Sequence, residues 1–200
     1  MSGMRITVSP PNGRYNFVEE WMSYAEEEGR NLFFQFFCYF LAFNHLYESK
    51  DLWNRNERVR LRSKEHISDL DKIIAFLMYA IVDSEGPRLN VVVEDSDYET
   101  LCSVKWHNPW NDYWAKDNPR ESRYVEDRIN GTDSPKWKTV QALTKVYRVR
   151  CNLFHGEKHI TDDRDRKLVE CSNNLLSAFL RECANHGLGL EHIHFSGNEE

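Results

Sequence analysis

Apolar residues recur along most of the chain with the spacing of amphipathic helices rather than the alternation of strands. This spacing predicts helices over residues 14–28, 31–50, 63–85, 119–131, 135–154 and 161–185. The run from Leu32 to Tyr47 is apolar nearly all round, so we expect its helix in the middle of the fold. The predicted fold class is therefore all-α, an antiparallel helical bundle joined mostly by short turns.

Residues with turn and capping preferences mark the expected helix ends. Gly29 suits the end of the first helix, and Asn31 suits the N-cap of the second. Pro135 suits the first turn of a long helix that we expect to end at about Phe154. Thr161 is the expected cap of the last helix.

The helical pattern is weakest at residues 87–118, which we expect to form an irregular insertion within a single domain spanning residues 1–200. Leu89 to Val93 has the character of a short strand without an obvious partner. The aromatic residues from Trp106 to Trp114 either pack the insertion onto the bundle or form a surface for a partner or for nucleobases. Residues 1–12 are an expected loose arm and residues 188–200 an expected mobile tail.

Composition narrows the class of protein. Five cysteines without a CxxC pair argue against a disulfide framework and favour the reducing cytoplasm. No apolar signal core begins the chain. The longest apolar run has sixteen residues and contains Gln35, Asn44 and His45, whereas a membrane span needs about 20 apolar residues. We therefore expect no membrane partner.

Positive charge is local in a chain of net charge −6. Residues 136–167 hold nine Lys and Arg against four Asp and Glu, and residues 55–64 hold five against one. Two basic islands on an acidic chain suit an anionic ligand bound at one cleft, although solvated helix faces would show the same composition.

The second half of the long helix gathers the candidate chemistry. A helical wheel of about 100° per residue places Arg150 in the middle of an apolar arc. The arc is formed by Leu143, Val146, Tyr147, Leu153 and Phe154. Lys145, Arg148, Asn152 and His155 share the opposite face. A guanidinium on an apolar face is costly unless it is ion-paired or opens into a cleft.

The segment Val149-Arg150-Cys151-Asn152-Leu153-Phe154-His155-Gly156-Glu157-Lys158 resembles the Arg-x4–6-His signature of HEPN domains, in the variant R-x-N-L-F-H-G. The resemblance covers about ten residues and the helix order over residues 120–186. It implies a HEPN-like bundle and a metal-independent endoribonuclease of toxin–antitoxin or antiviral defence systems. It also implies a homodimer in which the two motifs face each other, and a possible antitoxin or other regulatory protein as a partner.

The resemblance also implies residue roles. His155 would be the general acid or base, Arg150 would bind the scissile phosphate of RNA, and Asn152 would orient them. The 2′-hydroxyl would attack its own phosphate and leave a 2′,3′-cyclic phosphate. Arg148 is an alternative phosphate ligand, because it shares the face of His155 and fits the looser spacing. Lys145 and Lys158 are further candidates for substrate binding.

Other interpretations of the same residues stay open. A non-catalytic HEPN-like module would bind a nucleotide, an RNA or a protein partner. In a purely structural subunit, Arg150 and His155 would each be ion-paired in the core. We expect no cofactor and no metal, because the spacing of Cys183, His186, His192 and His194 matches no familiar zinc pattern. Since Arg150 and His155 point to different faces, a site shared between two copies or an unwound turn at residues 154–156 is expected.

Overall fold

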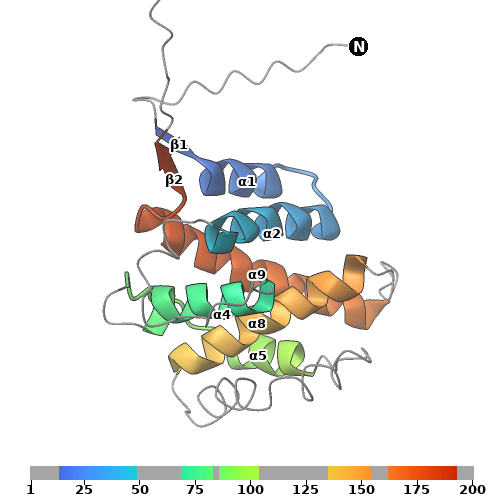
Figure 1. The fold of residues 1–200 in the computed structure, drawn as a ribbon. Coiled ribbons are helices and arrows are strands. Elements are labelled where there is room, and N and C mark those ends of the chain that lie inside the picture. The colour runs from blue at the N-terminus through green and yellow to red at the C-terminus, as the bar shows by residue number, and fades with distance from the viewer. Residues whose placement is uncertain (1–13, 49–68, 83–85, 104–134, 155–161, 193–200) are drawn as a thin grey trace, which may run out of the picture.

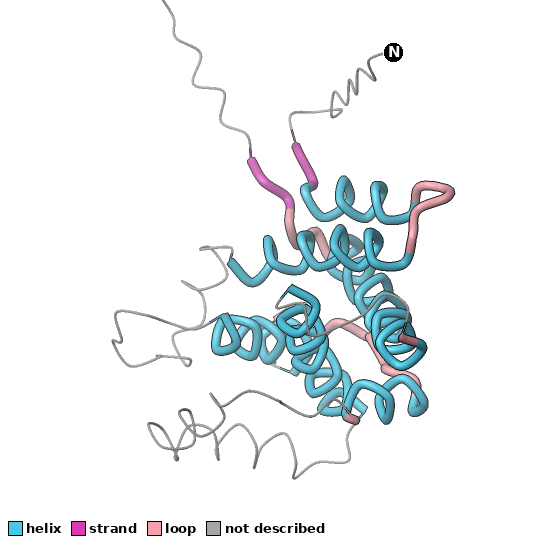
Figure 2. The backbone as a smooth tube through the Cα atoms, turned by 90° about the vertical axis from the view of Figure 1, so that its right-hand side faces the viewer, coloured by secondary structure: helices cyan, strands magenta, loops and turns pink. Residues whose placement is uncertain are grey.

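The computed structural model describes residues 14–48, 69–82, 86–103, 135–154 and 162–192. Over these residues the fold is all-α, as the sequence predicts, with one short pair of strands. The helical elements are α1 (Phe17–Glu26), α2 (Leu32–Glu48), α4 (Asp69–Leu77), a π-helical turn (Met78–Val82), α5 (Asp95–Cys102), α8 (Pro135–Phe154) and α9 (Asp163–Asn185). The paired α1 and α2 lie on one side of α9, and α4, α8 and α5 lie on the other (Figure 1; Figure 2 shows the same arrangement from the side).

The α1–α2 hairpin is built by local signals. Asn16 caps α1, because its Oδ1 accepts hydrogen bonds from the backbone N of Val18 (3.1 Å) and Glu19 (3.2 Å). Asn31 caps α2 in the same way, through Phe34 N at 2.8 Å, which confirms its predicted role. Gly29 stands in the connecting turn with a φ of +80°.

Two predicted boundaries at the ends of the chain are corrected by the strand pair. Residues Arg14–Asn16 form β1 instead of the first turn of α1, and Leu190–His192 form β2. The strands pair antiparallel, with Arg14 opposite His192. Residues 190–192 therefore belong to the fold rather than to a mobile tail, while the rest of the expected tail and the arm at 1–12 lie outside the described residues.

Helix α9 runs through the centre of the molecule and packs on α2. Phe43 of α2, Phe76 of α4 and Phe179 of α9 meet edge to face or tilted, with ring centroids 5.8–6.3 Å apart. Asp162, rather than the expected Thr161, caps α9, because its Oδ1 accepts hydrogen bonds from Arg164 N (2.8 Å) and Asp165 N (3.1 Å). The apolar faces of α2 and α9 are thus buried against each other.

The described half of the expected irregular insertion is part of the core. The extended segment is residues 89–94, in which the buried Leu89, Val91 and Val93 alternate with exposed residues, and α5 follows it and packs on α8 and α9. Thr139 of α8 binds the extended segment by hydrogen bonds to Val91 O (3.0 Å) and from Val93 N (3.3 Å). The predicted helix at 119–131 and the aromatic segment from Trp106 to Trp114 lie outside the described residues.

None of the described helices combines the length and the apolar character that crossing a bilayer would require.

Candidate functional site

Helix α8 carries the candidate site on its last two turns. Its buried residues are Thr139, Val140, Ala142, Leu143, Val146 and Val149. On a helical wheel these residues define an arc whose centre is the direction of Arg150. The predicted placement of Arg150 on the apolar face is therefore confirmed, and the chain is helical from Pro135 to Phe154 as predicted.

The guanidinium of Arg150 is held by aromatic rings. Its Cζ lies 5.6 Å from the ring centroid of Phe40 and 4.9 Å from that of Phe154. Its Nε is buried and has no hydrogen-bond partner among the described residues. A core ion pair of Arg150 is thus not formed within the described part of the chain, and the cation keeps donors for another acceptor.

Two phenols complete the surroundings of Arg150. Burial raises the pKa of Tyr147 and that of Tyr47 well above the usual range, and the positive charge of Arg150 opposes the rise in both. The carboxylate of Asp69 raises both pKa values further. Tyr47 donates its hydroxyl proton to Asn44 Oδ1. Both phenols are therefore neutral near pH 7 and serve as hydrogen-bonding groups rather than as bases.

The remaining predicted residues are only partly brought together. Lys145, Arg148 and Asn152 are half-buried on the side of α8 away from the direction of Arg150. His155, Lys158 and the basic segment 55–64 lie outside the described residues. Helix α8 stays helical through Phe154, and the expected unwinding at His155 and Gly156 also falls outside them. The structure therefore shows the surroundings of Arg150, and the proximity of Arg150 and His155 stays a prediction.

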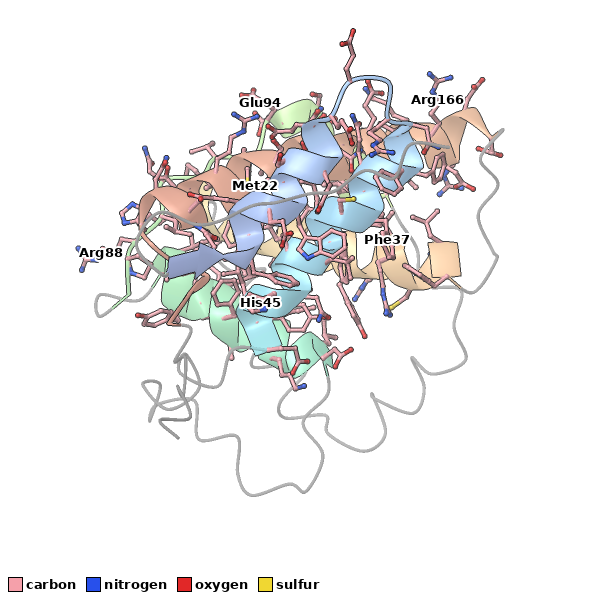
Figure 3. The ribbon with its side chains drawn as sticks, turned by 90° about the horizontal axis from the view of Figure 1, so that it is seen from above. Met22, Phe37, His45, Arg88, Glu94 and Arg166 are labelled. Carbon is pink, nitrogen blue, oxygen red and sulfur yellow. The ribbon has the colours of Figure 1, made fainter. Side chains whose placement is uncertain are left out.

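Sequence reasoning missed the contribution of α2 to this site. Phe40 contacts Arg150 and stacks on Tyr147 with ring centroids 6.5 Å apart, and Phe37 contacts Phe154 at 6.3 Å. Figure 3 shows Phe37 on the edge of α2 that faces α8. The only signal in the sequence is the density of phenylalanine in the run from Leu32 to Tyr47, and it predicts burial rather than a site.

The competing cysteine and histidine cluster is described only at Cys183 and His186, at the end of α9. Cys183 is fully buried, and burial raises the pKa of its thiol well above the usual value. His186 Nε2 lies 3.7 Å from Glu182 Oε1. Across the described segments no three metal-ligating side chains come together, and His194 lies beyond them.

Comparisons with protein-family models, with curated proteins and with solved structures gave no match to this chain.

Proposed function

We propose that the chain is a metal-independent endoribonuclease of the HEPN type that acts as a cytoplasmic homodimer in a toxin or antiviral defence system. The observation that supports it most is the state of Arg150. Near the end of α8, its guanidinium contacts the rings of Phe40 and Phe154, and its buried Nε has no hydrogen-bond partner among the described residues. Such a cation suits a phosphate, which accepts the planar fork of donors.

The proposed reaction uses the helix end as follows. The 2′-hydroxyl of a ribose attacks the neighbouring phosphorus, the bond to the 5′-oxygen breaks, and a 2′,3′-cyclic phosphate and a 5′-hydroxyl result. Arg150 stabilises the additional negative charge of the transition state. His155 transfers protons, since a histidine titrates near neutral pH, and Asn152 orients the reacting groups.

The surrounding charge favours the same ligand. Helix α8 carries five Lys and Arg and no acidic residue, although the whole chain has a net charge of −6. Lys145 and Arg148 would bind flanking phosphates of the RNA, and Lys158 would extend this surface beyond the helix. A positive surface of this kind raises the rate at which a polyanion is captured.

The test compares cleavage of a fluorescent single-stranded RNA by the wild-type chain and by His155→Ala and Arg150→Ala, with EDTA present. We expect each substitution to lower the cleavage rate about 100-fold or more. Arg150→Lys keeps the charge but loses the planar fork, and we expect an intermediate rate. The products should end in a 2′,3′-cyclic phosphate, which acid or a cyclic phosphodiesterase opens.

Arg181→Ala is the control for the loss of a surface cation. Arg181 is exposed and ion-paired with Glu26 at 2.7 Å, so its loss should leave cleavage unchanged. Equal cleavage by His155→Ala, Arg150→Ala and wild type would exclude the mechanism, and so would cleavage that EDTA abolishes. RNA binding by a wild-type chain that never cleaves would favour the non-catalytic module.

A further inference from the structure

Three phenylalanines form an exposed strip beside Arg150. Phe34 and Phe37 are one helical turn apart on α2, and Phe154 ends α8; their side chains are 37%, 40% and 58% exposed. The rings of Phe37 and Phe154 lie 6.3 Å apart. Among the described residues only Val92 is a further large apolar side chain with such exposure. Exposed rings gathered in this way indicate a binding surface rather than a core.

An arginine stands against each end of this strip. Arg30 Cζ lies 4.8 Å from the ring centroid of Phe34, and Arg150 Cζ lies 4.9 Å from that of Phe154. Arg30 is exposed and also pairs with Glu27, whereas the buried Nε of Arg150 has no acceptor among the described residues. The order of groups along the surface is therefore cation, aromatic rings, cation.

The helices that carry the strip lack negative charge. Helix α8 has no acidic residue, and the single acid of α2 is Glu48 at the end remote from Phe34 and Phe37. A ligand that is both planar and anionic complements this surface. Unpaired nucleotides have these properties, since bases stack on aromatic rings in any sequence while their phosphates bind arginine.

We propose that the strip of Phe34, Phe37 and Phe154, with Arg30 and Arg150, binds unpaired bases of single-stranded RNA next to the scissile phosphate. The inference rests on the proposed function for its assignment of RNA as the ligand. A second copy of the chain is the less favoured occupant, because packing phenylalanine rings against one another would leave the buried Nε of Arg150 without an acceptor.

The test measures binding rather than cleavage. The wild-type chain is titrated with a single-stranded octanucleotide that contains 2-aminopurine and 2′-O-methyl riboses, which cannot be cleaved by attack of the 2′-hydroxyl. We expect Phe37→Ala and Phe34→Ala each to raise the Kd roughly five-fold or more. Phe37→Leu should also weaken binding, whereas Phe37→Trp should retain it, since stacking requires a ring.

Val92→Ala is the matched control, because it also removes an exposed apolar side chain but lies on the segment that leads into α5, which packs on α8 and α9. It should bind like wild type. An unchanged Kd in Phe34→Ala and Phe37→Ala, or no binding by the wild-type chain, overturns the inference. Dissociation of a dimer by Phe37→Ala, with the RNA Kd unchanged, assigns the strip to a second copy and also overturns it.

Cleavage data separate this inference from the proposed function. If the phenylalanine variants bind RNA more weakly and the wild-type chain does not cleave it, the strip is a binding site and the endoribonuclease proposal is wrong. If cleavage requires His155 and the KM is unchanged in Phe34→Ala and Phe37→Ala, the endoribonuclease proposal holds and the strip is not an RNA-binding site.

Discussion

Thr139 shows how one buried hydroxyl can join two segments. It is fully buried on α8, and its Oγ1 accepts from Val93 N at 3.3 Å and lies 3.0 Å from both Val91 O and Pro135 O, which share its single proton. The extended segment has no neighbouring strand in the described part of the fold, so its backbone groups need partners of another kind. Thr139 supplies two of them.

We expect Thr139→Val to lower the free energy of unfolding by roughly 1–3 kcal/mol, because it keeps the shape of the side chain and leaves Val91 O and Val93 N without these bonds. The control is Thr144→Val on the same helix, where the lost bond is to Val140 O of the preceding turn. Urea unfolding of both variants measures the difference. Equal midpoints would show that Thr139 does not hold the segment.

For Arg150, the sequence predicts the face of the helix but not the residues that the side chain contacts. Its direction was predictable, because the rotation per residue of a continuous helix is fixed. Its partners were not, because Phe40 lies more than one hundred residues earlier and reaches Arg150 only through the packing of α2 near the end of α8. A helical wheel predicts which face of the helix a residue occupies, whereas the packing of other helices determines which side chains contact that face.

At the scale of elements, prediction succeeded where the signals are local. Asn31 caps α2, and α8 begins at Pro135 as predicted, because capping and proline preferences act within one turn. It failed at residues 87–103. The strand character of Leu89 to Val93 was visible, but the hydrogen-bond partners of this segment are Ala80 O of the π-helical turn and side chains of α8 and α9 rather than a strand.

Helix α5 was missed for a related reason. Its sequence from Asp95 to Cys102 is mostly polar, and only Leu101 is fully buried among its residues. An eight-residue helix with one buried apolar residue has almost no periodic signal. Packing against α8 and α9, not propensity, therefore stabilises it.

The turn from α9 into β2 offers a prediction at the same scale. Gly189 has a φ of +83°, and a Cβ there would come within 2.5 Å of Val18 Cγ2. Gly29 has a similar φ of +80° with open space around it. Both alanine substitutions destabilise the fold by on the order of 1 kcal/mol, because alanine is disfavoured at a positive φ. Only Gly189→Ala also introduces a steric clash.

Gly189→Ala should therefore lower the thermal midpoint more than Gly29→Ala, and Gly29→Ala serves as the control for the backbone term. Differential scanning calorimetry of the two variants gives the comparison directly. If Gly29→Ala is the more destabilised variant, the close approach of the α9–β2 turn to α1 does not exist in solution.

At the scale of the whole molecule, burial controls the charge state of the core. Thiols and phenols are distributed through α2, α8 and α9, and burial raises the pKa of several of them. These groups are Cys38, Tyr39, Tyr47, Tyr147, Cys171 and Cys183. Each is neutral in the folded chain at a pH where its unfolded form has begun to ionise.

This arrangement predicts a loss of stability in alkali. For a group whose folded pKa is raised, the folded state binds more protons than the unfolded state above the unfolded pKa, so the free energy of unfolding falls as pH rises. The pKa of Cys171 is raised from 9.0 to about 11 by burial and by Asp97. Its contribution is present below pH 9 and is lost between pH 9 and about 11.

Urea unfolding at intervals from pH 8 to pH 11 should therefore show a falling free energy of unfolding. Net negative charge also grows in alkali, so the wild-type slope alone does not identify the thiols. Cys171→Ala separates the two effects, because it removes one titrating thiol from the core and does not change the charged residues of the surface. Its slope should be shallower than that of wild type between pH 9 and 11, and parallel slopes would show that the Cys171 thiol does not resist ionisation in the fold.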